Sequence, residues 1–120
     1  MQKKINILGT EYEISTHKIS EDVFLKKNNF AGYCSEYTKE IVIADMTEEK
    51  FFPDMTDLEI EEYRKSVLRH EIVHAFLNES GLSVAANGTE GSWAKNEEMV
   101  DWIAIQSPKI FKVYTELNII

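Results

Sequence analysis

The stretch SVLRHEIVHAFLNESG, residues 66–81, places two histidines four residues apart with a glutamate directly after the first. Positions four apart in a helix lie on nearly the same side, about 6 Å apart along the axis, so His70 and His74 can reach one metal ion together. Glu71 is turned to the side of such an ion, where a carboxylate can take a proton from metal-bound water. The stretch therefore predicts two ligands and a general base for a catalytic zinc ion.

The helix that carries these residues has recognisable ends. Thr56 is followed three residues later by Glu59, the pattern in which both side chains bind free amide groups at a helix start. Gly81 is a left-handed stop, so the helix should end at about Ser80. Val67 shares a face with the two histidines, which places them toward the protein interior. Ionisable groups on such a face need a metal or an equivalent network as partner.

Two histidines leave the ligand set incomplete, because catalytic zinc takes three protein ligands and leaves the fourth position to water. The stretch NEEMVDWIA, residues 96–104, predicts a second helix, on which Glu97 and Asp101 share a face with the apolar Val100 and Ala104. A carboxylate that completes the coordination must come from an element that crosses the first helix. We therefore expect Glu97 to be the third ligand.

The neighbouring carboxylates are expected to have other roles. A histidine that binds a metal usually gives its other ring proton to a carboxylate or a carbonyl. Asp101, one turn beyond Glu97, is placed to accept that proton from His70. Glu98 is expected to be a solvated side chain at the helix start, where its charge complements the helix dipole.

The motif HEIVH, followed 23 residues after His74 by NEEMVD, resembles the gluzincin zinc metallopeptidases, whose second helix carries an Asn-Glu-x-x-Ser/Ala-Asp signature. The short chain and the run from Glu97 to Ala104 are also similar to the small ImmA/IrrE-type peptidases of phages and mobile elements. The resemblance implies Zn²⁺ as the cofactor and an intracellular endopeptidase that acts on a polypeptide. It also implies a role for each matching residue: zinc ligands His70, His74 and Glu97, general base Glu71, and an acid that orients a ligand, Asp101.

The segments before the histidine helix predict a small sheet. Short apolar runs around Gly9-Thr10 indicate a hairpin, and EYTKEIVIAD, residues 36–45, is the clearest strand because of its β-branched residues. Residues 17–29 are ambiguous, and residues 46–54 predict an acidic loop. We expect about three strands, antiparallel or mixed, packed on the long helix.

After that helix, residues 82–91 predict a loop, Ser92 an N-cap for a second helix, and Ser107-Pro108 the start of a third. Strands first and helices afterwards define an α+β class, and the resemblance implies a minimal zincin-like fold. The 120 residues fit one such domain over residues 1–120.

Composition narrows the function classes. The chain is 43% hydrophobic and 28% charged, as in ordinary globular proteins, and its formal net charge of -8 argues against nucleic acid as the main partner. The single cysteine, Cys34, excludes an internal disulfide, and no stretch approaches the roughly 20 apolar residues of a membrane-spanning helix. The sequence therefore predicts a cytoplasmic protein with a protein or peptide substrate and no membrane partner.

The walls of the cleft are only partly predictable. The strand within residues 36–45 is expected to form a sheet edge beside the histidine helix, where an extended peptide can pair with its backbone. Four aromatic residues are candidates for a side-chain pocket, although such residues are more often core: Phe51, Phe52, Trp93 and Trp102. The donor for the oxyanion of the reaction is left unassigned among Tyr33, Tyr37, Tyr63, Tyr114 and His17.

Three other interpretations stay open. Val73 and Val100 stand where many gluzincins carry smaller residues, and both could tighten the helix crossing, which leaves a catalytically degenerate module that binds a partner protein by occupancy. Two histidines and a carboxylate also describe the facial triad of non-haem iron enzymes, in which Glu71 would have no role, and a nickel enzyme is the related case. A metal-free interaction domain predicts no zinc and no thermal stabilisation by zinc.

Overall fold

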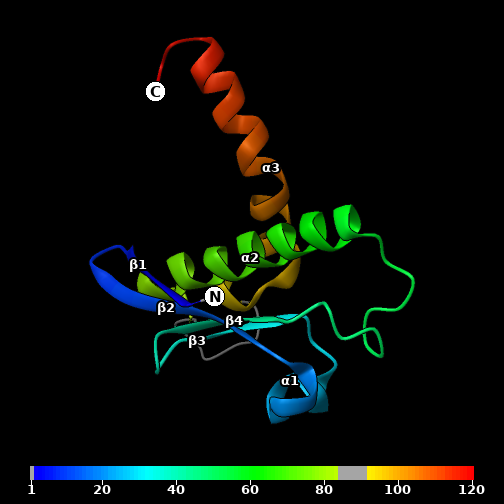
Figure 1. The fold of residues 1–120 in the computed structure, drawn as a ribbon. Helices are drawn as coiled ribbons and strands as arrows, with labels where there is room; N and C mark the ends of the chain where they lie inside the picture. The colour runs from blue at the N-terminus through cyan, green and yellow to red at the C-terminus, as the bar shows by residue number, and fades with distance from the viewer. Residues whose placement is uncertain (1, 84–91) are drawn as a thin grey trace.

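The computed structural model describes residues 2–83 and 92–120, which form an α+β fold (Figure 1). Within these residues the sheet has four strands in the order β1-β2-β4-β3. The strands are β1 (Gln2–Ile7), β2 (Thr10–His17), β3 (Gly32–Ser35) and β4 (Glu40–Ala44). The helices are α1 (Val23–Asn28), α2 (Asp57–Glu79) and α3 (Glu97–Glu116), with short 3₁₀ turns η1 (Ile19–Glu21) and η2 (Trp93–Lys95). No described helix is long and apolar enough to cross a membrane.

The first two strands form the predicted hairpin. Leu8 and Gly9 at its turn have φ values of 51° and 95°, and two successive positive φ values suit the twist of a two-residue hairpin turn. The side chain of Asn6 accepts a hydrogen bond from the Gly9 N–H at 2.8 Å. β2 then pairs with β4 in parallel, and β4 pairs with β3 antiparallel, so the sheet is mixed. It has one strand more than the three expected.

β4 is the central strand of the core, because its side chains are buried on both faces of the sheet. Ile41 and Ile43 pack in the cluster on the α2 side, whereas Val42 and Ala44 pack in a second cluster with Leu25 of α1. The expectation that this strand forms the sheet edge beside the cleft is wrong. A strand covered on both faces has a continuous apolar run, and the run itself does not reveal which strand lies at the edge.

Among the described residues, the sheet has two edge strands, β1 and β3, and β3 lies close against α2. A Cβ atom added to Gly32 would lie only 2.8 Å from Val67 Cγ1 and 3.0 Å from the Val42 carbonyl oxygen. Only glycine allows the strand to approach the helix to this distance. Cys34, two residues on, faces the same helix and accepts a long contact from Asn78 Nδ2 at 3.8 Å. Burial raises the pKa of the Cys34 thiol to about 12, so this side chain packs as a small neutral group.

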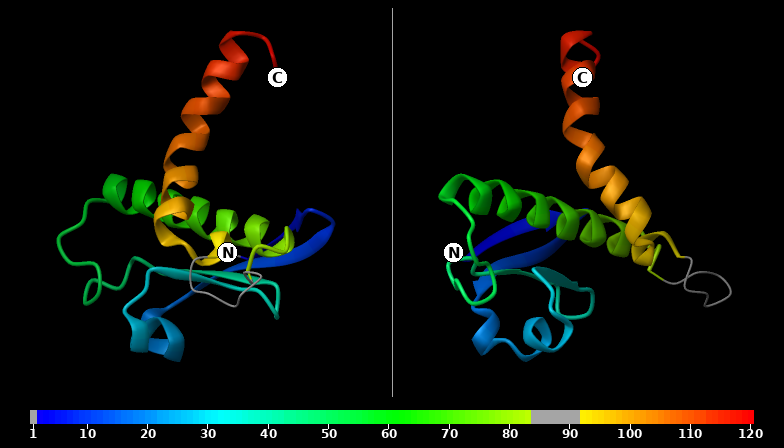
Figure 2. Two further views of the ribbon diagram at one scale, coloured as in Figure 1. Left: turned by 180° about the vertical axis from the view of Figure 1, so that it is seen from behind. Right: turned by 90° about the vertical axis from the view of Figure 1, so that its right-hand side faces the viewer.

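α2 begins and ends as the sequence predicts. The Thr56 side chain accepts from the Glu59 N–H at 3.1 Å, and the Glu59 carboxylate accepts from the Thr56 N–H at 3.0 Å. The last helical residue is Glu79, and Gly81 follows with a φ of 80°. Views from two further directions show α2 lying across the sheet (Figure 2). This packing fixes which side of α2 faces the edge strand.

α3 differs from the sequence prediction at two places, its N-cap and the segment around Ser107-Pro108. Asn96, not Ser92, caps the helix, because its side chain accepts from the Met99 N–H at 3.0 Å; the Ser92 hydroxyl instead donates to the Ser83 carbonyl at 3.2 Å. The separate third helix expected at Ser107-Pro108 is wrong, since α3 runs through Pro108. An interior proline removes one amide hydrogen bond and crowds the carbonyl of the preceding turn, but the turns on either side of Pro108 continue the helix. Of the loop expected over residues 82–91, residues 84–91 lie outside the described residues.

Candidate functional site

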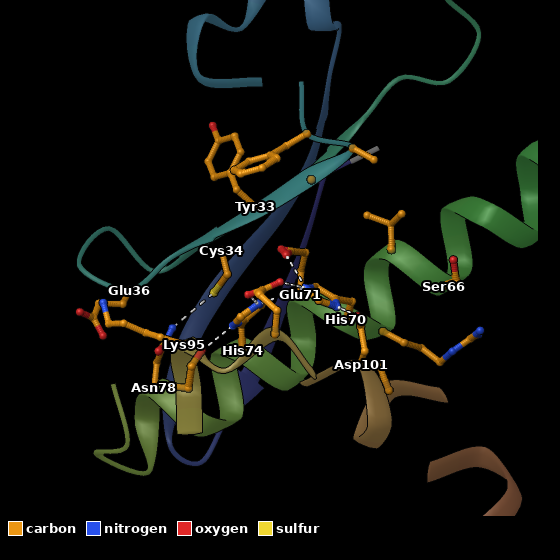
Figure 3. Close-up of a pocket in the computed structure, with 18 of the residues that line it drawn as sticks. Tyr33, Cys34, Glu36, Ser66, His70, Glu71, His74, Asn78, Lys95 and Asp101 are labelled. Carbon is orange, nitrogen blue, oxygen red and sulfur yellow. Dashed lines mark hydrogen bonds and ion pairs between the residues drawn. The ribbon is translucent and has the colours of Figure 1, made fainter. Parts of the chain in front are cut away.

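His70 and His74 occupy successive turns of α2 on the side that faces β3 and the start of α3 (Figure 3). Their side chains are 20% and 14% exposed, so both rings are largely buried, as the shared face with Val67 predicts. The two Nε2 atoms lie 3.1 Å apart. The four-residue spacing on the helix therefore directs both rings toward one point.

Glu97 reaches that point from α3. Its Oε2 lies 3.1 Å from His70 Nε2, and its Oε1 lies 2.9 Å from His74 Nε2. The helix crossing is held by Val100 and Ala104, which are 0% and 4% exposed. The Glu97 side chain itself is 65% exposed, so the cluster is open to water on this side. The structure thus brings together the three residues that the sequence nominates as ligands.

The Nδ1 atoms of His70 and His74 make hydrogen bonds that fix the tautomer of each ring. His74 Nδ1 lies 2.7 Å from the Ala94 carbonyl oxygen, which can only accept, so we assign the proton to Nδ1. His70 Nδ1 lies 2.7 Å from Asp101 Oδ1 and is assigned in the same way. Asp101 is therefore where the sequence places it, whereas the role of Ala94 could not be read from its residue type.

These tautomers make the cluster a fit for a cation. In a neutral ring with the proton on Nδ1, the Nε2 lone pair is bare, and here two such lone pairs face the carboxylate of Glu97. Three electron-pair donors at about 3 Å repel one another unless a positive charge lies between them. Imidazole nitrogen and carboxylate oxygen are the ligand types that zinc takes at catalytic sites. The donor set and its open side therefore suit a divalent metal ion such as zinc.

Glu71 lies beside the cluster rather than at its centre. Glu71 is only 5% exposed, and its Oε1 lies 3.8 Å from His70 Nε2. Its Oε2 has no hydrogen-bond partner among the described residues. Burial raises the pKa of this carboxyl to about 7, with the charge of Glu97 adding to the effect and that of His70 opposing it. Ligand atoms of His70, Glu71 and His74 all lie within 4.8 Å of one another. A buried carboxylate oxygen without a protein partner is rare and calls for a water, an ion or a reacting group beside it.

The cluster opens into a cavity of about 700 Å³ between α2, α3 and β3. The four aromatic residues that the sequence offers as pocket candidates do not line this cavity. Phe51 and Phe52 pack against the two core clusters, while Trp93 and Trp102 are 55% and 58% exposed. The aromatic residues that line the cavity come from other segments: Phe24, Phe30, Tyr33, Tyr37 and Tyr63. Phe24 lies in α1, within residues 17–29 that the sequence leaves ambiguous, and Phe30 follows directly after that stretch.

Two of the candidate oxyanion donors already bind another side chain. The Tyr33 hydroxyl donates to Asp22 at 3.0 Å, and His17 Nδ1 lies 2.7 Å from the same carboxylate. Tyr114 lies in the last turns of α3 and does not line the cavity, whereas Tyr37 and Tyr63 do. Two cations that the sequence analysis did not single out also line the cavity, Arg69 and Lys95. Their charge suits a developing oxyanion, and Lys95 stands only two residues before Glu97.

Two crossing helices thus surround one point with two imidazoles and a carboxylate. A buried acid lies beside that point, and an open cavity lies in front of it. The valines at Val73 and Val100 do not hold the helices apart, because the three side chains meet at 2.9 to 3.1 Å. No family model, no curated protein and no solved structure matches this chain.

Proposed function

We propose that this protein is an intracellular zinc-dependent endopeptidase of the gluzincin type. The observation that carries the proposal is the convergence of His70 Nε2, His74 Nε2 and the Glu97 carboxylate within 3.1 Å, with both Nδ1 atoms held by other groups. Zinc bound by these residues would supply the Lewis acidity that activates a water and polarises the scissile carbonyl. The free thiol of Cys34 fits a reducing compartment.

Proton transfer falls to Glu71. Its unpartnered oxygen can take the proton of the attacking water and later pass it to the leaving amine. Asp101 and the Ala94 carbonyl hold the two rings in the orientation that keeps Nε2 toward the ligand point. The carboxyl and the imidazoles therefore have separate tasks.

The free edge of β3 offers a place for an extended substrate. The Ala44 N–H donates to the Ala31 carbonyl at 2.8 Å, and this bond sets the alternation of the antiparallel pair. Tyr33 bonds β4 in the same way, so Gly32 and Cys34 direct their N–H and C=O groups away from the sheet. No strand of the described chain pairs with this edge. A polypeptide can add there through its backbone, which supports an endopeptidase over an enzyme for small molecules.

The test separates metal binding from chemistry. Glu71→Gln should keep about one zinc per chain and lose turnover by about 10² to 10⁴-fold, the usual contribution of a general base. Glu97→Ala should lose zinc, whereas Glu98→Ala, which changes an exposed neighbour on the same helix, should keep both zinc and turnover. Zinc is measured by mass spectrometry after dialysis, and turnover is followed as cleavage of a randomised octapeptide library.

Two outcomes would contradict the proposal. Full zinc content in Glu97→Ala would remove this carboxylate from the ligand set, and undiminished cleavage by Glu71→Gln would remove the general base. A wild-type protein that binds zinc but cleaves nothing would instead favour the partner-binding module.

A further inference from the structure

We infer that the cavity contains an aromatic subsite, formed by Phe24, Phe30 and Tyr33, that takes one large apolar side chain of an extended peptide. The inference rests on the proposed function and names the class of substrate that the site accepts. Two independent observations support it: rings with uncovered faces at one end of the cavity, and the side-chain alternation of β3.

The three rings form a connected group. The ring centroids of Phe24 and Phe30 are 5.8 Å apart, and those of Phe24 and Tyr33 are 4.8 Å apart in an edge-to-face arrangement. Phe24 and Phe30 are 48% and 45% exposed, although both line the cavity that holds His70 and Glu71. The hydrogen bond from the Tyr33 hydroxyl to Asp22 fixes the third ring. Large apolar faces are therefore preformed and open to a ligand.

Strand geometry links this group to the metal ligands. Figure 3 shows Cys34 pointing toward α2 and Tyr33 pointing to the opposite side of β3. A Cβ atom added to Gly32 would also face α2, because it would meet Val67. A peptide that adds to the edge of β3 follows the same alternation. Its residue opposite Tyr33 would direct its side chain at the rings, with Cβ atoms about 5 Å apart.

The neighbours of that residue would point toward α2 and the ligands. The rings and the ligands are thus reached by side chains one residue apart in the same peptide. Asp22, the acid bonded to the Tyr33 hydroxyl, is 8% exposed and also accepts hydrogen bonds from His17 and the Leu25 N–H. Because the Asp22 carboxylate is already bonded and the ring faces are apolar, a charged substrate side chain would gain no partner from these groups, so the subsite should select aromatic or large aliphatic residues.

The first experiment uses the zinc-loaded protein and a randomised octapeptide library, with cleavage sites read by mass spectrometry. Wild type should enrich aromatic and large aliphatic residues about 10-fold at one position near the scissile bond. Phe24→Ala and Phe30→Ala should each lose this enrichment. Val23→Ala should keep it, because Val23 is in α1 and 81% exposed but does not line the cavity.

A double-mutant cycle sharpens the assignment. On a peptide with the preferred residue, Phe24→Ala should lower kcat/KM about 10-fold; on the same peptide with alanine at that position, wild type and variant should agree. Circular dichroism and thermal unfolding check the fold of each variant. Phe24→Leu keeps apolar volume in α1, and Phe30→Ala lies outside the helix, so a folding failure of one variant leaves two others.

A binding experiment separates this inference from the proposed function. The same library is captured on immobilised Glu71→Gln protein, with and without the Phe24→Ala change, so that no turnover is required. Cleavage by wild type without enrichment, or enrichment that survives in Phe24→Ala and Phe30→Ala, overturns the subsite and leaves the peptidase standing. No cleavage, together with capture of aromatic peptides that depends on Phe24, supports the subsite and overturns the peptidase. Neither cleavage nor selective capture overturns both.

Discussion

The molecule contains two histidine–aspartate pairs that share the same Nδ1–carboxylate distance but differ in the groups around the other ring nitrogen. His70 and His17 each place Nδ1 2.7 Å from a carboxylate oxygen, of Asp101 and Asp22 respectively. The Nε2 of His70 meets a second imidazole and the Glu97 carboxylate, whereas the Nε2 of His17 meets the Ser15 hydroxyl at 3.2 Å. The pair is the same in both places, so the proposed metal site depends on the groups around the second nitrogen.

The two aspartates also differ in their other contacts. The Asp101 side chain is 61% exposed and holds His70, whereas Asp22 is 8% exposed and also caps α1 through the Leu25 N–H at 3.0 Å. The order Ser15–His17–Asp22 is that of a nucleophilic triad, but none of the three lines the cavity. We therefore assign the His17 pair to the fold, where it ties β2 to the start of α1.

The largest expected difference between the pairs is in zinc content. His70→Ala removes one of the three proposed ligands and should lose zinc, together with the thermal stabilisation that zinc would give the wild type, which is about 2.7 kcal/mol at 100 times its Kd. His17→Ala should keep both. Zinc analysis and thermal unfolding at matched zinc concentrations measure the effects. Equal zinc content in the two variants would contradict the assignment of different roles to the two histidines.

A smaller effect distinguishes the aspartates. Asp101→Asn should weaken zinc binding about 10 to 100-fold, because the variant loses the carboxylate that orients the His70 ring and raises its basicity. Asp22→Asn should leave the zinc affinity unchanged and lower the free energy of unfolding by about 1 to 2 kcal/mol, since hydrogen bonds to a charged group are lost. Competition with a chromogenic chelator and urea unfolding give the two quantities, and a reversal of the pattern would show that the roles are exchanged.

The smallest effect is on the pH dependence of stability. Burial raises the pKa of the Asp22 carboxyl, but hydrogen bonds from His17, the Leu25 N–H and Tyr33 together outweigh it and hold the pKa below its ordinary value. Because the folded pKa is the lower one, the ionised carboxylate stabilises the fold above the unfolded pKa of about 4, and this contribution is lost as pH falls through the folded value. Urea unfolding at pH 5 and at pH 3 should therefore show a smaller loss for Asp22→Asn than for wild type. Equal losses would exclude Asp22 as a source of acid sensitivity.

The sequence by itself determined the features that depend on neighbours along the chain. The capping box of Thr56 and Glu59, the stop at Gly81, the four-residue spacing of His70 and His74, and the hairpin at Gly9 were predicted correctly, because hydrogen bonds and helical periodicity act over a few residues. The apolar Val100 and Ala104, on the same face of α3 as Glu97, likewise indicated which side of this helix would turn inward.

Only the tertiary structure decided what depends on partners far apart in the chain. Whether β3 or β4 lies at the edge follows from which strands pair, and the apolar run of β4 is the same in either case. The approach of β3 to α2 at Gly32, the hydrogen bond of His74 to a backbone carbonyl, and the gathering of Phe24 and Phe30 at the cavity arise from packing between segments. Backbone carbonyls and ring positions carry no pattern in the sequence, so folding alone brings them to the site.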